Sequence, residues 1–100
     1  MNENTEVNIT QELRLYLLTD PDYNAGDYDE FDSAVVAACN EGEARKIHPS
    51  GLAKWDDEKE RWDHFNGHAW RFPQKVECQY IGDAAEGIEK GVICSSFNAG

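Results

Sequence analysis

The stretch LRLYLL, residues 13–18, decides the expected fold together with a second stretch, AVVAAC, residues 34–39. In the first stretch leucines alternate with Arg14 and Tyr16, which is the period of a β-strand. The second is a short apolar run with β-branched residues near its start, typical of a strand buried on both faces. Two such strands in a chain of 100 residues predict that a sheet forms the centre of the fold.

The segments around these strands predict one short helix and further strands. Asn40 is a suitable N-cap with Glu43 three residues on, and Pro49 and Gly51 end the segment, which predicts a helix over about 41–48. Apolar alternation predicts strands over 76–80 and 92–97. The expected fold class is α+β, with a small, mostly antiparallel sheet of four to six strands, that one helix, and a long acidic loop over about 20–33.

Residues 52–75 allow two interpretations, and they contain Trp55, Trp62 and Trp70. The charged run DDEKER favours a helix over 56–64. The Asn66-Gly67 pair favours a hairpin over 61–72, which would pair Trp62 with Arg71. The two interpretations conflict at residues 61–64, and the hairpin is slightly preferred.

The chain is expected to be one domain over residues 12–100, after a loose leader over residues 1–11. Twenty acidic residues against nine Lys and Arg give a net charge of −11. Such a charge repels phosphate backbones and anionic lipids, so direct nucleic-acid or membrane binding is not expected. The favoured partner is a host protein with a basic surface, although the acidity could also serve solubility alone. No oligomeric state is indicated, and a polar N-terminus predicts a cytoplasmic location in the host cell.

The acidic loop is the first candidate binding site, because aromatic residues alternate there with carboxylates. Aromatic rings supply contact area at interfaces, and acids around them select a basic partner. A second, weaker patch lies in the Trp-rich segment. The candidate partner-binding residues are Asp22, Tyr23, Asp27, Tyr28, Asp29, Glu30 and Asp32 in the loop, and Trp55, Asp56, Asp57 and Glu58 in the second patch.

Metal binding and catalysis are weaker interpretations of the same residues. Asp20, Asp22 and Asn24 alternate as calcium ligands do, but Ala25 and Phe31 stand where an EF-hand needs Gly and Glu. His64 and His68 have a helical metal spacing that Asn66-Gly67 interrupts.

Cys39, Cys78 and Cys94 lie in apolar stretches and are expected to be reduced core residues. No nucleophile motif or phosphate loop is present, so we expect neither an enzyme nor a cofactor or metal.

Three stretches together resemble a group of small bacteriophage and prophage proteins. They are a Gly-Tyr-Asp-x-Tyr/Phe-Asp-Ser-like segment at 26–33, with Asp27 inserted, an E-x-x-A-R-x-I-H-P-like segment at 41–49, and a terminal Ser-Phe-Asn-Ala-Gly. The resemblance covers about two thirds of the chain, omits residues 52–75 and brings no catalytic residues with it. It implies a phage-encoded origin.

Origin and charge together favour a phage protein that inhibits a host defence or nucleic-acid-handling protein. This would be an inhibitor of the anti-CRISPR or anti-restriction type, presenting carboxylates where phosphates would bind. One alternative is a small-molecule or metal-binding module, such as a scavenger of a defence signal, with a pocket lined by Trp62, His64 and Trp70. The other alternative is a structural or assembly factor of the phage particle.

Overall fold

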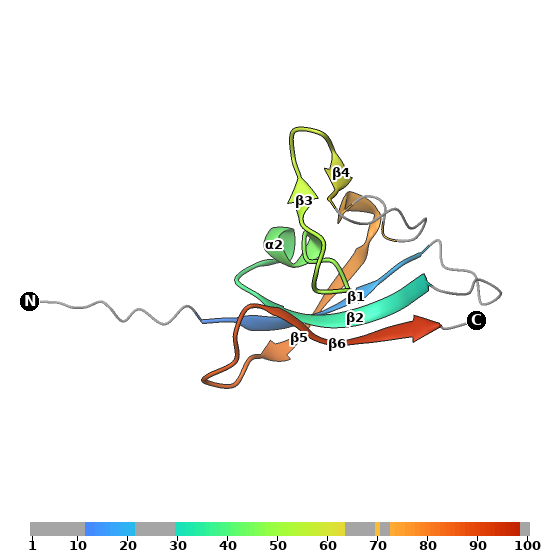
Figure 1. The fold of residues 1–100 in the computed structure, drawn as a ribbon. Helices are drawn as coiled ribbons and strands as arrows, with labels where there is room; N and C mark the ends of the chain where they lie inside the picture. Colours follow the sequence, from blue (N-terminus) through green and yellow to red (C-terminus); the bar gives the residue numbers. More distant parts are fainter. Residues whose placement is uncertain (1–11, 22–29, 64–69, 71–72, 99–100) are drawn as a thin grey trace, which may run out of the picture.

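A four-stranded antiparallel sheet forms the centre of the protein. The computed structural model describes residues 12–21, 30–63, 70 and 73–98. Within them the sheet has the order β5-β1-β2-β6, and these strands span Glu77–Asp83, Arg14–Thr19, Glu30–Ala38 and Gly91–Asn98 (Figure 1). The expected α+β fold with a mostly antiparallel sheet is therefore confirmed, and β1 and β2 are its inner strands.

The buried face of β1 is set by Tyr16 and Leu18. Leu18 lies opposite Ala34 of β2, and both side chains are buried. Leu15 and Leu17, whose alternation predicted the strand, point to the other face and are half-buried. The alternation of apolar residues identified the strand. It could not identify which face of the strand lies in the core, because the core face is the one that other elements cover.

A short helix, α2, spans Glu41–Arg45. The Asn40 side chain accepts a hydrogen bond from the Glu43 amide, which caps the helix as expected. The prediction that the helix continues to residue 48 is wrong, because Ile47 forms a β-bridge with Lys54. Arg45 donates to the backbone carbonyl of Val76 and thereby ties α2 to the segment before β5.

A two-stranded hairpin lies between α2 and β5. Its strands are β3, Trp55–Asp56, and β4, Arg61–Trp62, with Trp55 opposite Trp62. The interpretation of residues 56–64 as a helix is therefore wrong. Of the preferred hairpin over 61–72, both the turn and Arg71 lie outside the described residues. The pairing of Trp62 that the structure describes is with Trp55.

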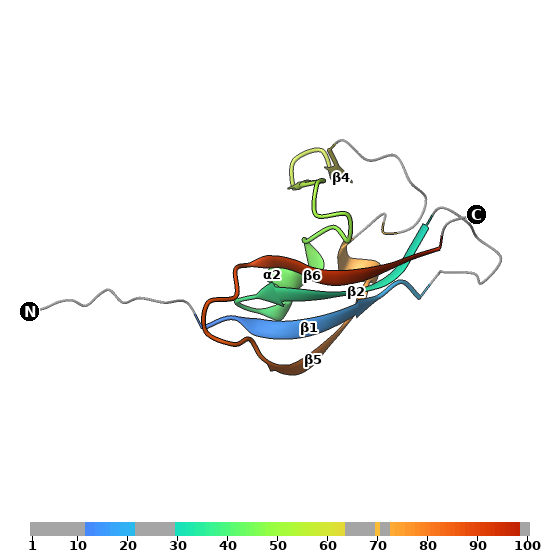
Figure 2. The same ribbon diagram turned by 60° about the horizontal axis from the view of Figure 1, so that its bottom comes forward.

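All of these smaller elements lie on the same face of the sheet. In both views α2, the β3–β4 hairpin and the 3-10 helix η1, Pro73–Lys75, stand on one side of it (Figures 1 and 2). The core lies between them and the sheet, and it includes the buried side chains of Leu18, Val36, Trp62, Trp70 and Val76. Among the described residues, no element covers the opposite face, which faces the viewer in Figure 2.

The expected acidic loop over 20–33 is shorter than the sequence suggested. Strand β2 begins at Glu30, and Asp32 and Ser33 belong to it. The aromatic residue Phe31 explains the difference, because its ring packs against the core and lies 4.8 Å from the ring of Phe97 on β6. A position with such packing favours a strand over a solvated loop.

Candidate functional site

Most candidate residues of the acidic loop, Asp22, Tyr23, Asp27, Tyr28 and Asp29, lie outside the described residues. The remaining two, Glu30 and Asp32, are part of β2. The Asp32 side chain is half-buried and accepts a hydrogen bond from the Ser33 hydroxyl at 3.2 Å. Asp32 is therefore anchored in the sheet.

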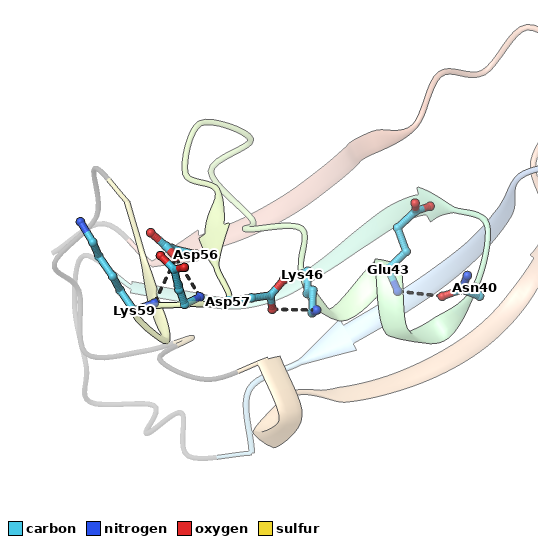
Figure 3. A network of polar contacts seen from close by, with 7 residues as sticks. Asn40, Glu43, Lys46, Asp56, Asp57 and Lys59 are labelled. Carbon is cyan, nitrogen blue, oxygen red and sulfur yellow. Dashed lines mark hydrogen bonds and ion pairs between the residues drawn. The ribbon is translucent and has the colours of Figure 1, made fainter.

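The second patch forms the β3–β4 hairpin, where its residues are largely engaged within the protein (Figure 3). The Trp55 ring packs edge-to-face on Trp62 with centroids 5.3 Å apart. Asp56 accepts from the backbone amides of Lys59 and Glu58, and these bonds lower the pKa of its carboxyl group. Asp57 pairs with Lys46 at 2.9 Å. The first three residues of this patch therefore support the hairpin, and Glu58 is exposed at its turn.

An acidic pocket lies at the end of the sheet where β1 begins and β5 ends. It is open, it has a volume of about 1270 Å³, and α2 closes one side of it through Asn40 and Glu41. We call it the acidic pocket, and it is lined by Glu12, Leu13, Arg14, Tyr16, Asn40, Glu41, Tyr80, Asp83, Ala84, Ala85, Glu86, Gly87 and Ile88.

Two tyrosines form the aromatic part of this pocket. The antiparallel register of β1 and β5 places Tyr16 opposite Tyr80, and their rings meet edge-to-face at 6.0 Å. Tyr16 is buried, whereas Tyr80 is 53% exposed. The Tyr80 hydroxyl donates to the Asp83 carboxylate at 2.7 Å, and this bond raises the pKa of Tyr80. An exposed ring fixed by a hydrogen bond presents a rigid surface to a ligand.

The charge of the pocket is mainly negative. Four carboxylates line it, those of Glu12, Glu41, Asp83 and Glu86. Arg14 is the cation among the lining residues; a hydrogen bond to Tyr16 is the main reason that its pKa is raised. With four negative charges against one positive charge, the pocket favours a cationic group.

The sequence did not indicate this site, because its residues are far apart in the chain. Tyr16 and Tyr80 become neighbours only through the strand register. A signal was nevertheless present, since each tyrosine lies in an expected strand and has an acidic or basic residue within three positions. The rule used for the loop, aromatic residues next to acids, applies to β5, where Glu77 and Asp83 lie near Tyr80, but not to β1, where the charged residue near Tyr16 is Arg14.

The described residues contain no group of three or more His, Cys, Asp or Glu side chains that could hold a metal ion. The calcium and zinc interpretations fall largely outside them, because Asp22, Asn24, His64 and His68 are not described. Of the alternative pocket of Trp62, His64 and Trp70, His64 lies outside the described residues, and Trp62 and Trp70 are buried in the core and 6% and 2% exposed.

The cysteines are free thiols, and only part of the expectation for them is confirmed. Cys39 and Cys78 are half-buried, and burial raises the pKa of the Cys78 thiol, which disfavours a reactive thiolate. The expectation of a core position is wrong for Cys94, which is exposed on the edge strand β6. Strand periodicity cannot separate an edge strand from an inner one.

His48, the last residue of the helix expected over about 41–48, is a core residue. It is 1% exposed, and its ring lies 4.9 Å from that of Trp62 and 6.0 Å from that of Phe31. Its Nδ1 accepts a hydrogen bond from the Ser50 amide at 3.0 Å. Burial lowers the pKa of His48 to about 4, so the imidazole is neutral near pH 7 and part of the core.

Comparison of the chain with protein-family models, with curated protein sequences and with solved structures found no match. Within the described part of the chain, no helix has the length and apolar character needed to cross a membrane.

Proposed function

We propose that this protein is a phage- or prophage-encoded acidic binding protein that inhibits a host defence or nucleic-acid-handling protein. It binds the basic surface of that protein and presents carboxylates where the target would bind phosphates. The observation that carries the proposal is the acidic pocket, in which four carboxylates surround two tyrosine rings. Carboxylates steer a basic partner toward the site and pair with its Lys or Arg side chains, and the rings supply contact area.

The distribution of ion pairs supports this proposal. The described residues include three salt bridges, Arg45–Glu41, Lys46–Asp57 and Lys90–Glu43. Glu12 and Glu86 line the pocket outside these pairs and are exposed. Solvated carboxylates are available to an incoming Lys or Arg without first breaking an internal pair, which favours binding.

The same geometry explains why a protein partner is favoured over nucleic acid. A phosphate backbone approaching the pocket would meet the carboxylates of Glu12, Glu41, Asp83 and Glu86. A basic groove built for nucleic acid meets those carboxylates as counter-charges. The acidic loop belongs to the proposal as a second contact region on the evidence of its sequence, with Asp27 and Asp29 as its central acids.

The test is a capture experiment with bacterial proteins that have been retained on heparin, a polyanion that selects basic surfaces. The pocket variant carries Glu12→Gln, Glu41→Gln, Asp83→Asn and Glu86→Gln. The control neutralises three exposed acids that lie outside both the pocket and the candidate patches, with Glu60→Gln, Glu77→Gln and Glu89→Gln. We expect wild type and control to retain a nucleic-acid-binding protein that the pocket variant loses. Equal retention by both variants would contradict the assignment of the pocket.

A second candidate function, binding of a small cationic molecule, is favoured by the same pocket. Its exposed Tyr80 ring and the Asp83 carboxylate beside it suit an ammonium or guanidinium group. A thermal-shift series with polyamines, arginine derivatives and nucleotides separates the two functions. Stabilisation by a small cation in the absence of any protein would favour this second function, and no shift would favour a protein partner.

A further inference from the structure

A second pocket concentrates positive charge in this strongly acidic chain. It has a volume of about 390 Å³, and Lys46, Lys54 and Lys90 line it. They are three of the nine Lys and Arg residues of the chain, whereas no Asp or Glu among the described residues lines this pocket. We call it the lysine pocket. Its volume is in the usual range for small-molecule sites, about 300–1,000 Å³.

The lysine pocket also has an apolar part that belongs to the edge of the core. Ile47, Trp55 and Val92 line the pocket, and all three are half-buried residues that pack against the core. The Trp55 ring is held in place by its edge-to-face contact with Trp62 at 5.3 Å. A fixed aromatic residue beside ammonium groups suits a ligand that has both a planar ring and a negative charge.

Lys54 is held in this pocket by its backbone. Its β-bridge to Ile47 places it beside the end of α2, where Lys46 lies. The Lys54 amide donates to the Asp63 carboxylate at 2.7 Å, and the Lys54 carbonyl accepts from the Asp63 amide at 2.8 Å. The Lys54 side chain is exposed and forms none of the salt bridges in the described part of the chain. Its ammonium group is therefore available to a ligand.

The other two lysines are held by carboxylates that do not line the pocket. Lys46 pairs with Asp57 at 2.9 Å (Figure 3), and Lys90 pairs with Glu43 at 2.8 Å. An ammonium group has three N–H donors, so each lysine keeps donors for a ligand after this bond. The hydrogen bond to Glu43 raises the pKa of Lys90, which keeps the amine charged. The three ammonium groups and the two carboxylates together leave one positive charge at the pocket.

We propose that the lysine pocket binds a small organic phosphate that carries a planar ring, of the class of the nucleoside monophosphates. The phosphate contacts the ammonium groups of Lys46, Lys54 and Lys90, and the ring packs on Trp55. Charge limits the size of the ligand. At about 0.1 M salt, charges more than about 10 Å away are largely screened, so a single phosphate group responds mainly to the nearby lysines. A nucleic-acid strand carries further phosphates across a chain of net charge −11 and is repelled.

This site is independent of the proposed function, because the lysine pocket and the acidic pocket share no lining residue. The variant with four substitutions in the acidic pocket should bind a nucleotide at least as tightly as wild type, since it removes negative charge at a distance. Loss of nucleotide binding with retention of a basic partner would overturn this inference alone. Loss of the basic partner with retention of the nucleotide would overturn the proposed function alone.

The test is an NMR titration of the full chain with adenosine monophosphate. In wild type we expect saturable shifts at the amides of Lys54, Lys90 and Gly91 and at the indole of Trp55. Lys54→Gln should weaken binding about tenfold or more, because it removes one charged donor from the phosphate. Lys59→Gln is the matched control: it removes the same charge at an exposed residue in the turn between β3 and β4, outside the pocket, and should leave the affinity unchanged.

Three further ligands test the chemistry of the site in wild type, without any substitution. Adenosine lacks the phosphate and inorganic phosphate lacks the ring, so each should bind more weakly than adenosine monophosphate. A 5′-phosphorylated DNA strand of about ten nucleotides should also bind more weakly, because its additional phosphates are repelled. Equal or tighter binding of any of the three overturns the proposal. So does the absence of shifts at the pocket with adenosine monophosphate at up to about 10 mM, or an equal loss of affinity in Lys54→Gln and Lys59→Gln.

Discussion

The indole nitrogen of Trp62 donates a hydrogen bond to the backbone carbonyl of Trp70, and both side chains are buried. This bond joins the β3–β4 hairpin to a residue with a left-handed backbone, because Trp70 has φ of 66°. Such a conformation is uncommon for a bulky residue and must be held by its surroundings. The Trp62–Trp70 bond therefore fixes the path of the chain across the core.

Substituting Trp62→Phe removes this donor and leaves a buried carbonyl without it. We expect the free energy of unfolding to fall by about 2–4 kcal/mol, from the lost bond and the lost ring area. Trp70→Phe is the matched control, because it removes the same indole volume and keeps the accepting carbonyl. Urea denaturation should show the larger loss for Trp62→Phe, and equal losses would mean that the hydrogen bond contributes nothing.

Leu18 is the centre of the core, with no exposed surface and Ala34 opposite it. Leu18→Ala should lower the free energy of unfolding by about 2–5 kcal/mol, the usual cost of a cavity in a packed core. Leu52→Ala provides the contrast, because Leu52 is 81% exposed and should give a change near zero. Similar denaturation midpoints for the two variants would contradict the assignment of the core face.

Asn40 should contribute measurably to the stability of α2, since its side chain accepts from the Glu43 amide at 2.8 Å. Asn40→Ala is expected to cost about 1 kcal/mol, whereas Asn40→Asp keeps the acceptor and should cost little. Thermal denaturation of the two variants separates these outcomes. The prediction fails if Asp and Ala have the same effect at this position.

Stability should decrease in mild acid because of His48. Its pKa is about 4 in the folded protein against 6.5 for the free side chain. Above pH 6.5 the imidazole is neutral in both the folded and the unfolded protein. As pH falls from there toward about 4, only the unfolded chain takes up a proton at His48. The free energy of unfolding should therefore fall by about 2 kcal/mol between about pH 7 and about pH 5.

The matched variant for this prediction is His48→Asn, whose amide oxygen can accept from the Ser50 amide as Nδ1 does. It is expected to be less stable than wild type at neutral pH, because the ring contacts with Trp62 and Phe31 are lost. The informative quantity is the slope of the free energy of unfolding against pH. This slope should be smaller in the variant between about pH 7 and about pH 5. The same slope in both proteins would assign the pH dependence to other groups.

Local patterns predicted the strands, the helix cap and the fold class, because they act over a few residues. The alternation at 13–18 and the Asn40–Glu43 spacing are of this kind. The end of α2 could not be predicted, since it depends on the bridge between Ile47 and Lys54. The burial of His48 likewise requires the rings of Trp62 and Phe31, which come from distant segments.

The candidate site shows the same division between local and distant information. Composition predicted an acidic binding surface, and neighbouring residues suggested the loop and the Trp-rich segment as its location. The acidic pocket instead depends on the pairing of Tyr16 with Tyr80 and on the position of Glu41 at the start of α2. Contacts between residues so far apart in sequence follow from sheet topology, which charge patterns do not encode.

The central claim, that the carboxylates of the acidic pocket bind basic side chains, is tested most directly by NMR titration with an arginine-rich peptide at low and high salt. The account predicts shifts concentrated at Tyr16, Tyr80 and Asp83, a loss of affinity of at least about tenfold when salt rises from about 0.05 M to about 0.5 M, and no binding by the pocket variant. Binding that is unaffected by salt, or that maps away from these residues, would contradict the account.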